Sequence, residues 1–254
     1  MPHIYRCHLT LMEPTFFSSR EISNFYQTEP LVGNFALAYA FEFCRSPYFN
    51  DGAIHYREHL GALNEEGVYV TPATIQGDPR FTVGQFNAQP DTYWFAMGSG
   101  VLVTRPDDGW VEGEGKTWRV FRAEGDRGKK VSSANRPQFG RIRYLSIGNE
   151  AVCYVISEPE VRIPRYIRLG KFMSKARVQV EAVTYQAVEE THARVPFLLN
   201  PADLPAETNL HVYDLVNVPP TPLVRNAVLS GEFHRVDRET YLPAGMRFGV
   251  EDLP

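Results

Sequence analysis

The sequence has few cysteines, no long hydrophobic run and none of the short motifs that mark the common catalytic sites. No apolar run reaches the roughly 18 residues that a membrane-spanning helix requires. The N-terminal segment lacks a basic leader followed by an apolar stretch, so no secretory signal is expected. The three cysteines, Cys7, Cys44 and Cys153, are odd in number and far apart, which is typical of a protein without a disulfide framework. These absences predict a cytoplasmic protein.

Glycine-rich phosphate loops, nucleophile-elbow serines and cysteine spacings suited to zinc are also absent. One short string, HYREH at residues 55–59, would place two histidines and a carboxylate on one helical face, as a zinc peptidase requires. No third ligand follows at a convincing helical spacing, so a surface helix carrying two histidines is the better interpretation. We therefore expect no metal site and no cofactor.

Charge is the most informative feature that the sequence does contain. The chain is net acidic, at −4, yet residues 115–177 hold all five lysines and ten of the 21 arginines, against five acidic residues. This span carries +10 and the rest of the chain −14. A solvated charged face normally mixes both signs, whereas segregated charge steers association with a partner. We predict that the span contacts a polyanion, of which a phosphate backbone is the commonest.

Aromatic residues lie among these cations, as they do on surfaces that bind single-stranded nucleic acid. Rings stack on bases at about 1–3 kcal/mol per base, while lysine and arginine neutralise phosphates. The segment YIRLGKFMSKARV (166–178) has four cations and no carboxylate. Within it, LGKFMSKA follows a predicted strand, where N–H groups, a hydroxyl and two ammonium groups could meet a phosphate. The polar connection 123–140 is too long for a tight turn, which indicates a functional or mobile loop.

Strand patterns outnumber helix patterns along the chain. The main helix is expected at about 28–43, with Pro30 in its first turn, and a second helix near 53–63. Alternating apolar residues predict single strands at 4–11, 116–122, 161–169 and 176–188. They also predict two hairpins, one of 93–97 with 101–104 and one of 141–147 with 151–157. The remaining C-terminal residues are also β-rich. The pattern predicts an α+β fold with a mainly antiparallel sheet.

Several segments, in order along the chain, resemble those of the Cas-five-type subunit of type I-D CRISPR Cascade. They are IYRCHLTL followed by FFSSREIS and by TEP before an alanine-rich stretch, then GVYVTPA, YIRLGKFMSKARV and YLPAGMRFG. The resemblance implies a RAMP protein, with a ferredoxin-like (RRM-like) βαββαβ core and a protruding thumb, although the glycine-rich loop of many RAMP proteins is not evident. The resemblance thus predicts a single domain over residues 1–254. Within it, the span 115–177 is the RNA-facing segment and includes the basic thumb-like insertion at 123–140. Residues 178–254 form an elaboration of additional antiparallel β-strands.

The resemblance also implies a role. In Cascade, this subunit grips the 5′ handle of the guide RNA (crRNA) and caps one end of the backbone filament, in antiviral defence. It contacts the backbone subunit and the large subunit, and target DNA is a further candidate partner. A separate endonuclease usually matures the RNA, so the subunit is expected to have no catalytic residue. The candidate RNA-binding residues are Arg20, Lys116, Arg119, Arg122, Arg127, Lys129, Lys130, Arg136, Arg141, Arg143, Tyr166, Arg168, Lys171, Phe172, Ser174, Lys175 and Arg177.

Two alternatives stay open from the sequence. The first is a metal-independent RAMP-type endoribonuclease that processes precursor CRISPR RNA, because His, Tyr and Lys residues near the basic segment suffice for general acid–base cleavage. The second is a protein adaptor whose basic face meets an acidic protein.

Overall fold

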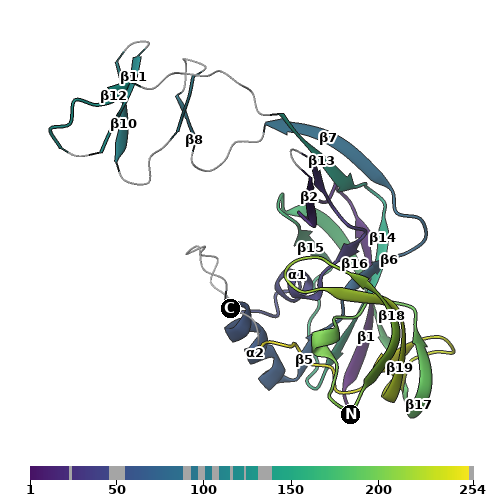
Figure 1. The fold of residues 1–254 in the computed structure, drawn as a ribbon. Coiled ribbons are helices and arrows are strands. Elements are labelled where there is room, and N and C mark those ends of the chain that lie inside the picture. Colours follow the sequence, from purple (N-terminus) through teal and green to yellow (C-terminus); the bar gives the residue numbers. More distant parts are fainter. Residues whose placement is uncertain are drawn as a thin grey trace. The chain divides into compact units, whose positions relative to one another are not determined.

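The structure is a computed structural model that describes residues 1–22, 25–45, 55–87, 93–96, 101–104, 109–114, 117–122, 124–130 and 139–251. About 49% of it is strand and 11% helix, which is compatible with the predicted α+β class. The chain divides into two compact units, each described by itself below (Figure 1). The first unit comprises Met1–Glu21, Tyr26–Val83 and Arg143–Pro254, and the second comprises Ile22–Phe25 and Gly84–Ile142. The assignment of a single domain stays a prediction.

The first unit is built on a seven-stranded antiparallel sheet in the order β15-β16-β1-β14-β6-β4, with β5 also paired to β14. The central strand β1 pairs with β14 on one side and with β16 on the other. The strands are β1 (His3–Leu11), β4 (Leu31–Val32), β5 (Val68–Val70), β6 (Ala73–Ile75), β14 (Glu150–Ser157), β15 (Tyr166–Leu169) and β16 (Ser174–Val183).

Strand β1 confirms the alternation that the sequence predicts at 4–11. Cys7, Leu9 and Leu11 are buried on one face, as period-two side chains of a half-buried strand must be. Cys7 lies directly opposite Cys153 of β14, and both are free, fully buried thiols. The centre of the sheet is therefore also the centre of the hydrophobic core.

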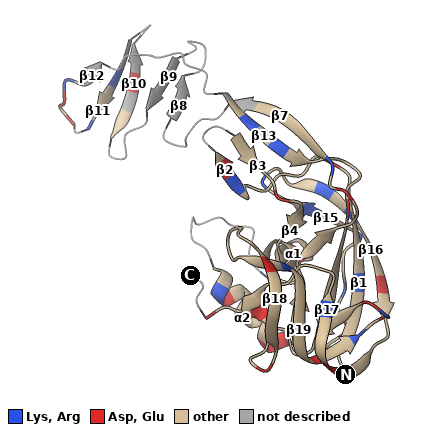
Figure 2. Cartoon of the chain, turned by 45° about the vertical axis from the view of Figure 1, so that its right-hand side comes forward, with Lys and Arg blue, Asp and Glu red and all other residues tan. Residues whose placement is uncertain are grey.

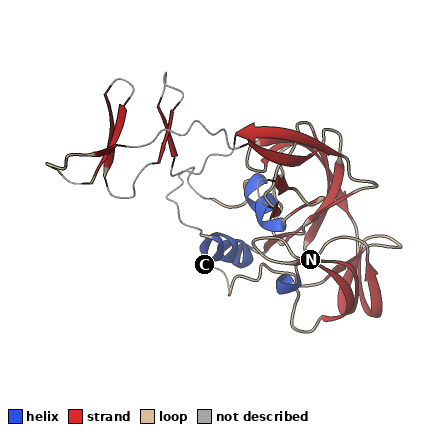
Figure 3. Ribbon diagram, turned by 45° about the horizontal axis from the view of Figure 1, so that its top comes forward, coloured by secondary structure: helices blue, strands red, loops and turns tan. Residues whose placement is uncertain are grey.

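Two helices pack on strands of this sheet, α1 (Asn34–Ala40) and α2 (Tyr56–Glu66) (Figure 3). The predicted second helix is confirmed by α2, which ends at Gly67 in the left-handed conformation that favours glycine. The prediction of a helix from residue 28 is wrong at its start, because Leu31 and Val32 form β4 against β6 and α1 begins only after Gly33. Among the described residues, no helix is long and apolar enough to span a bilayer.

The predicted hairpin of 141–147 with 151–157 is wrong in its pairing. Both strands form, as β13 (Phe139–Leu145) and β14, but they belong to different sheets. Strand β13 joins the order β2-β3-β13-β7, in which β2 is Arg20–Ile22, β3 is Phe25–Gln27 and β7 is Phe81–Asn87. The buried Asn149 explains the divergence, since its amide binds the backbone of Arg80 and the carbonyl of Ser146. The turn between the two strands is therefore built around a third segment.

A second sheet forms the C-terminal part of the first unit, which confirms the predicted β-rich character. Its order is β17-β19-β18, with β20 paired to β19. Phe197 packs on Tyr154 of β14 with ring centroids 5.3 Å apart, and Arg6 of β1 forms an ion pair with Asp237. The two sheets thus share one core. The elements are β17 (Gln186–Val195), the short 3-10 helix η1 (Pro201–Asp203), β18 (Asn209–Val216), β19 (Leu223–Arg235) and β20 (Tyr241–Pro243).

The second unit contains a hairpin and a three-stranded sheet. The hairpin of β8 (Tyr93–Ala96) with β9 (Val101–Thr104) confirms the pairing that the sequence predicts. The sheet has the order β10-β11-β12, and β11 confirms the strand expected at 116–122. The candidate thumb 123–140 contributes β12, and its residues 123 and 131–138 lie outside the described residues. The strands of the small sheet are β10 (Trp110–Glu114), β11 (Thr117–Phe121) and β12 (Lys129–Lys130).

Candidate nucleic-acid interface

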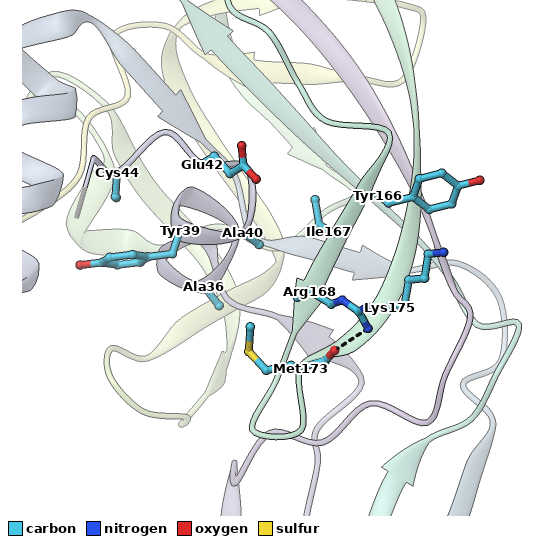
Figure 4. A pocket seen from close by; sticks show the side chains of 10 residues that line it. All are labelled: Ala36, Tyr39, Ala40, Glu42, Cys44, Tyr166, Ile167, Arg168, Met173 and Lys175. Carbon is cyan, nitrogen blue, oxygen red and sulfur yellow. Dashed lines mark hydrogen bonds between the residues drawn. The ribbon is translucent and has the colours of Figure 1, made fainter. Parts of the chain in front are cut away.

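A groove of about 680 Å³ lies between α1 and the hairpin of β15 and β16 in the first unit; we call it the hairpin groove (Figure 4). The side that α1 and the following turn provide is mostly apolar, whereas the hairpin supplies the cations. Five of the lining residues belong to the predicted basic segment. The lining residues are Ala36, Tyr39, Ala40, Glu42, Cys44, Tyr166, Ile167, Arg168, Met173 and Lys175.

The register of the hairpin gathers its polar residues on one face. Tyr166 lies opposite Arg177, and Arg168 lies opposite Lys175. Directly opposed residues of an antiparallel pair share a face, so these four side chains form one patch. The alternate residues of both strands, such as Ile167, are buried on the other face. Figure 2 shows blue basic residues on β15 and β13, whereas the one charged residue of β18 is the acidic Asp214.

Besides Glu42 of the groove lining, Glu13 is an acidic residue at this surface, and it is one that the sequence does not predict. Its carboxylate lies 3.6 Å from the guanidinium of Arg168 and accepts a hydrogen bond from the backbone N–H of Lys175 at 2.7 Å. Arg168 also donates to the carbonyl of Met173 at 3.1 Å, and the Lys175 ammonium lies 4.4 Å from the centre of the Tyr166 ring. Glu13 lies more than 150 residues before the hairpin, so only the fold brings them together.

The turn of the hairpin is fixed to residues 14–16 by hydrogen bonds. The Lys171 N–H donates to the Phe16 carbonyl at 2.9 Å, and the buried Ser174 hydroxyl donates to the Pro14 carbonyl at 2.7 Å. The hypothesis that N–H groups and this hydroxyl hold a phosphate therefore needs revision, since these donors already have protein acceptors. The side chain of Lys171, which is exposed at this turn, remains a candidate contact for an anion.

Protonation of the groove lining follows from burial. Burial raises the pKa of Tyr39 well above its ordinary value, and its hydroxyl is hydrogen-bonded to Nδ1 of His59 at 2.8 Å. Burial also raises the pKa of Cys44 to about 12. Both groups are therefore neutral at neutral pH, and neither is an anion that would repel phosphate.

A second groove, of about 510 Å³, adjoins β15 and shares Tyr166 with the hairpin groove. Arg165 and Arg177 supply its cations. The sequence list includes Arg177 and omits Arg165, although the position of Arg165 in the basic span just after Pro164 was a usable signal. The lining residues are Ile163, Arg165, Tyr166, Arg177, Val178, Gln179 and Val180.

Two predicted residues of the first unit lie outside both grooves and have protein partners. Arg20 forms an ion pair with Glu29 at 2.9 Å. The Arg143 guanidinium lies 4.3 Å from the centre of the Phe81 ring and donates to the Thr28 carbonyl at 3.3 Å. The structure thus gives Arg143 a packing role.

Phe172, at the turn of the hairpin, is exposed, and the remaining predicted residues belong to the second unit. Arg119, Arg122, Arg127 and Arg141 are exposed there, and Arg119 donates to the carbonyls of Arg127 and Gly128. Lys129 and Lys130 form β12, and their side chains are not described; Lys116 and Arg136 lie outside the described residues.

The histidines of the HYREH string lie at the start of α2. Nδ1 of His55 is 3.4 Å from the Glu58 carboxylate, and the rings of His55 and His59 have centroids 5.7 Å apart. In the part of the chain that the structure describes, no three His, Cys, Asp or Glu side chains are grouped so that they could hold a metal ion.

Together, the fold and the grooves define an α+β protein that presents cations and aromatic rings at the edge of an antiparallel sheet. The chain belongs to the family described as Type I-D CRISPR-associated protein Cas5/Csc1, whose family model matches residues 2–251. A search of curated proteins found no match. Family membership confirms the resemblance and supports a role as a subunit of a CRISPR Cascade complex.

Proposed function

We propose that the protein is a non-catalytic RNA-binding subunit of type I-D Cascade, which holds the 5′ handle of the crRNA and caps the backbone filament. The observation that carries the proposal is the face of the hairpin on which Tyr166, Arg168, Lys175 and Arg177 lie together. Cations neutralise phosphates and exposed rings stack bases, which is the combination that single-stranded RNA requires. The backbone subunit, the large subunit and target DNA are its proposed further partners.

We also propose that the seven-stranded sheet derives from a ferredoxin-like RAMP core. The order β16-β1-β14-β6 supports this, because every neighbour is antiparallel and the helices α1 and α2 connect β1 to the β5–β6 region. Residues 158–165, between β14 and β15, contain no helix. The second crossover of a βαββαβ core would therefore be a loop in this chain.

A paired set of charge reversals tests the RNA-binding role. Lys171→Glu with Lys175→Glu should weaken crRNA binding by the complex at least about tenfold and flatten its salt dependence, since about 0.7 counterions are released per phosphate contact to a single strand. The matched control is Arg57→Glu with Arg194→Glu, which makes the same charge change at two exposed positions on α2 and β17. Equal effects of the two pairs, or normal crRNA binding after the lysine changes, would contradict the proposal.

The same purified protein tests the proposed lack of catalysis. Incubated with repeat RNA in the absence of metal, it should leave the RNA intact. Site-specific cleavage that disappears on one His, Tyr or Lys substitution would instead identify the endoribonuclease alternative.

A further inference from the structure

Phe172 is an exposed aromatic ring at the turn of the β15–β16 hairpin. Its exposed fraction is 56%, whereas Phe16 beneath it is 4% exposed. The two rings are stacked, with centroids 5.6 Å apart and planes inclined by 24°. Tyr144 contacts the Phe172 ring from another direction at 6.2 Å. One face of Phe172 is therefore supported by protein, and its exposure indicates that the other face is open to solvent.

The turn that carries this ring has two residues with an unusual, left-handed backbone conformation. Gly170 has φ +70°, and a Cβ there would lie 2.3 Å from the Phe16 carbonyl oxygen, so no other residue fits without a shift. Met173 has φ +53°, a left-handed conformation that non-glycine residues rarely adopt because it strains the backbone. An isolated exposed ring is common on protein surfaces. A ring fixed by a strained turn on a buried ring is preorganised for contact.

The charges around the ring favour a nucleic acid as its partner. The neighbouring Lys171 is exposed and forms no ion pair with any described residue, and the cations of the hairpin groove belong to the same hairpin. Lysine is depleted in the cores of protein–protein interfaces, where it would have to be desolvated. A base stacked on the ring places its own phosphates beside such cations. The ring then contacts the base of a nucleotide, and the cations contact its phosphate.

We infer that Phe172, supported by Phe16 and Tyr144, is a stacking platform for one unpaired base of the RNA. This inference rests on the proposed RNA-binding function and adds a contact to a base, in addition to contacts with phosphates. Stacking of this kind tolerates any base, because every base has a π-face.

The test compares two probes and two variants of the full-length protein. The probes are an oligoadenylate of about 12 nucleotides, near the size that such surfaces cover, and an abasic ribose-phosphate oligomer of the same length. Phe172→Leu keeps an apolar side chain and removes the ring, whereas Phe172→Tyr keeps the ring. Filter binding should show that Phe172→Leu weakens oligoadenylate binding about 5- to 150-fold and leaves binding of the abasic oligomer unchanged. Phe172→Tyr should bind both probes as the wild type does.

The outcomes separate the platform from the proposed function. If the wild type binds both probes equally, the platform is overturned and the RNA-binding role stands. If the wild type binds neither probe, both fail. If Phe172→Leu binds oligoadenylate normally but no longer copurifies with other Cascade subunits, the ring contacts protein and the inference is wrong. Circular dichroism confirms that each variant is folded.

Discussion

Asp203 is a buried carboxyl group that links three parts of the first unit. Oδ2 accepts hydrogen bonds from the Asn34 amide at 2.6 Å and the Tyr69 hydroxyl at 2.8 Å, and Oδ1 accepts one from the Gly249 N–H at 2.8 Å. Burial raises the pKa of Asp203 from its ordinary 3.8 to about 7, although these hydrogen bonds act in the opposite direction. The residue therefore joins α1, β5 and the C-terminal segment through a group that titrates near neutrality.

This raised pKa predicts a pH-dependent free energy of unfolding. From about pH 4 to about pH 7 the native state keeps a proton that the unfolded chain has released, so stability falls as pH rises. The slope from this group is at most about 1.4 kcal/mol per pH unit. Asp203→Asn should lower stability at every pH but flatten that slope, as measured by urea unfolding followed by circular dichroism.

Asp78→Asn, at an exposed position, is the control for this experiment and should keep the wild-type slope. An Asp203→Asn variant whose slope equals that of the wild type would show that the carboxyl group is ionised in the native state.

The sequence predicts the cations of the hairpin, and it does not predict their partners. Alternation alone places Tyr166 with Arg168, and Lys175 with Arg177, on shared faces. Joining these two pairs requires the strand register, which the turn at Gly170 sets. The contact with Glu13 depends on tertiary packing, because Glu13 follows β1, which pairs with β16, and the contact joins residues that are 162 positions apart in the sequence.

At the scale of elements, the cations of the β15–β16 hairpin are opposed by the carboxylate of Glu13, which lies just after β1. Glu13→Gln should strengthen RNA binding several-fold, because it removes a negative charge beside Arg168 while its amide oxygen can still accept from the Lys175 N–H. Both side chains of the ion pair are about half exposed, so the loss of stability should stay below about 1 kcal/mol. Filter binding and urea unfolding measure the two effects.

Glu66→Gln on α2 is the matched control, since it makes the same charge change at an exposed position of another element. If the two variants bind RNA equally, the carboxylate of Glu13 does not oppose RNA at the groove.

Element identity was more predictable than element pairing. Strand periodicity correctly places β1, β11 and β14, because a half-buried strand alternates whatever its neighbours are. Pairing depends on competition between distant segments, and β14 is paired along its length with β1 instead of with β13. The start of α1 was missed for a similar reason. Thr28 is buried and its hydroxyl bonds the backbone of Phe17, which holds this stretch extended where proline suggested a helix.

At the scale of the whole molecule, the two units differ in how much core they contain. The main hydrophobic cluster is formed by residues of the first unit. Strands β7 and β13, which lead into and out of the second unit, are neighbours in their sheet. Replacing residues 88–138 by a Gly-Ser linker of about six residues should therefore leave the first unit folded.

The same deletion tests the candidate thumb, because it removes most of 123–140. We expect weaker binding and a shallower salt dependence for crRNA, with the free energy of unfolding of the first unit changed by no more than about 1 kcal/mol. A truncated protein that binds crRNA with the full-length affinity would exclude a contribution of the second unit to binding. A truncated protein that does not fold would show that the first unit depends on the second.

The division into two units has a practical optical consequence. All three tryptophans, Trp94, Trp110 and Trp118, belong to the second unit, where the Trp110 ring stacks on Phe121 at 5.5 Å. Intrinsic emission excited at the red edge of indole absorption therefore comes from that unit alone, while most of the tyrosines lie in the first. The native chain thus carries a built-in reporter on one half, and comparing it with far-ultraviolet ellipticity would reveal whether the halves melt together.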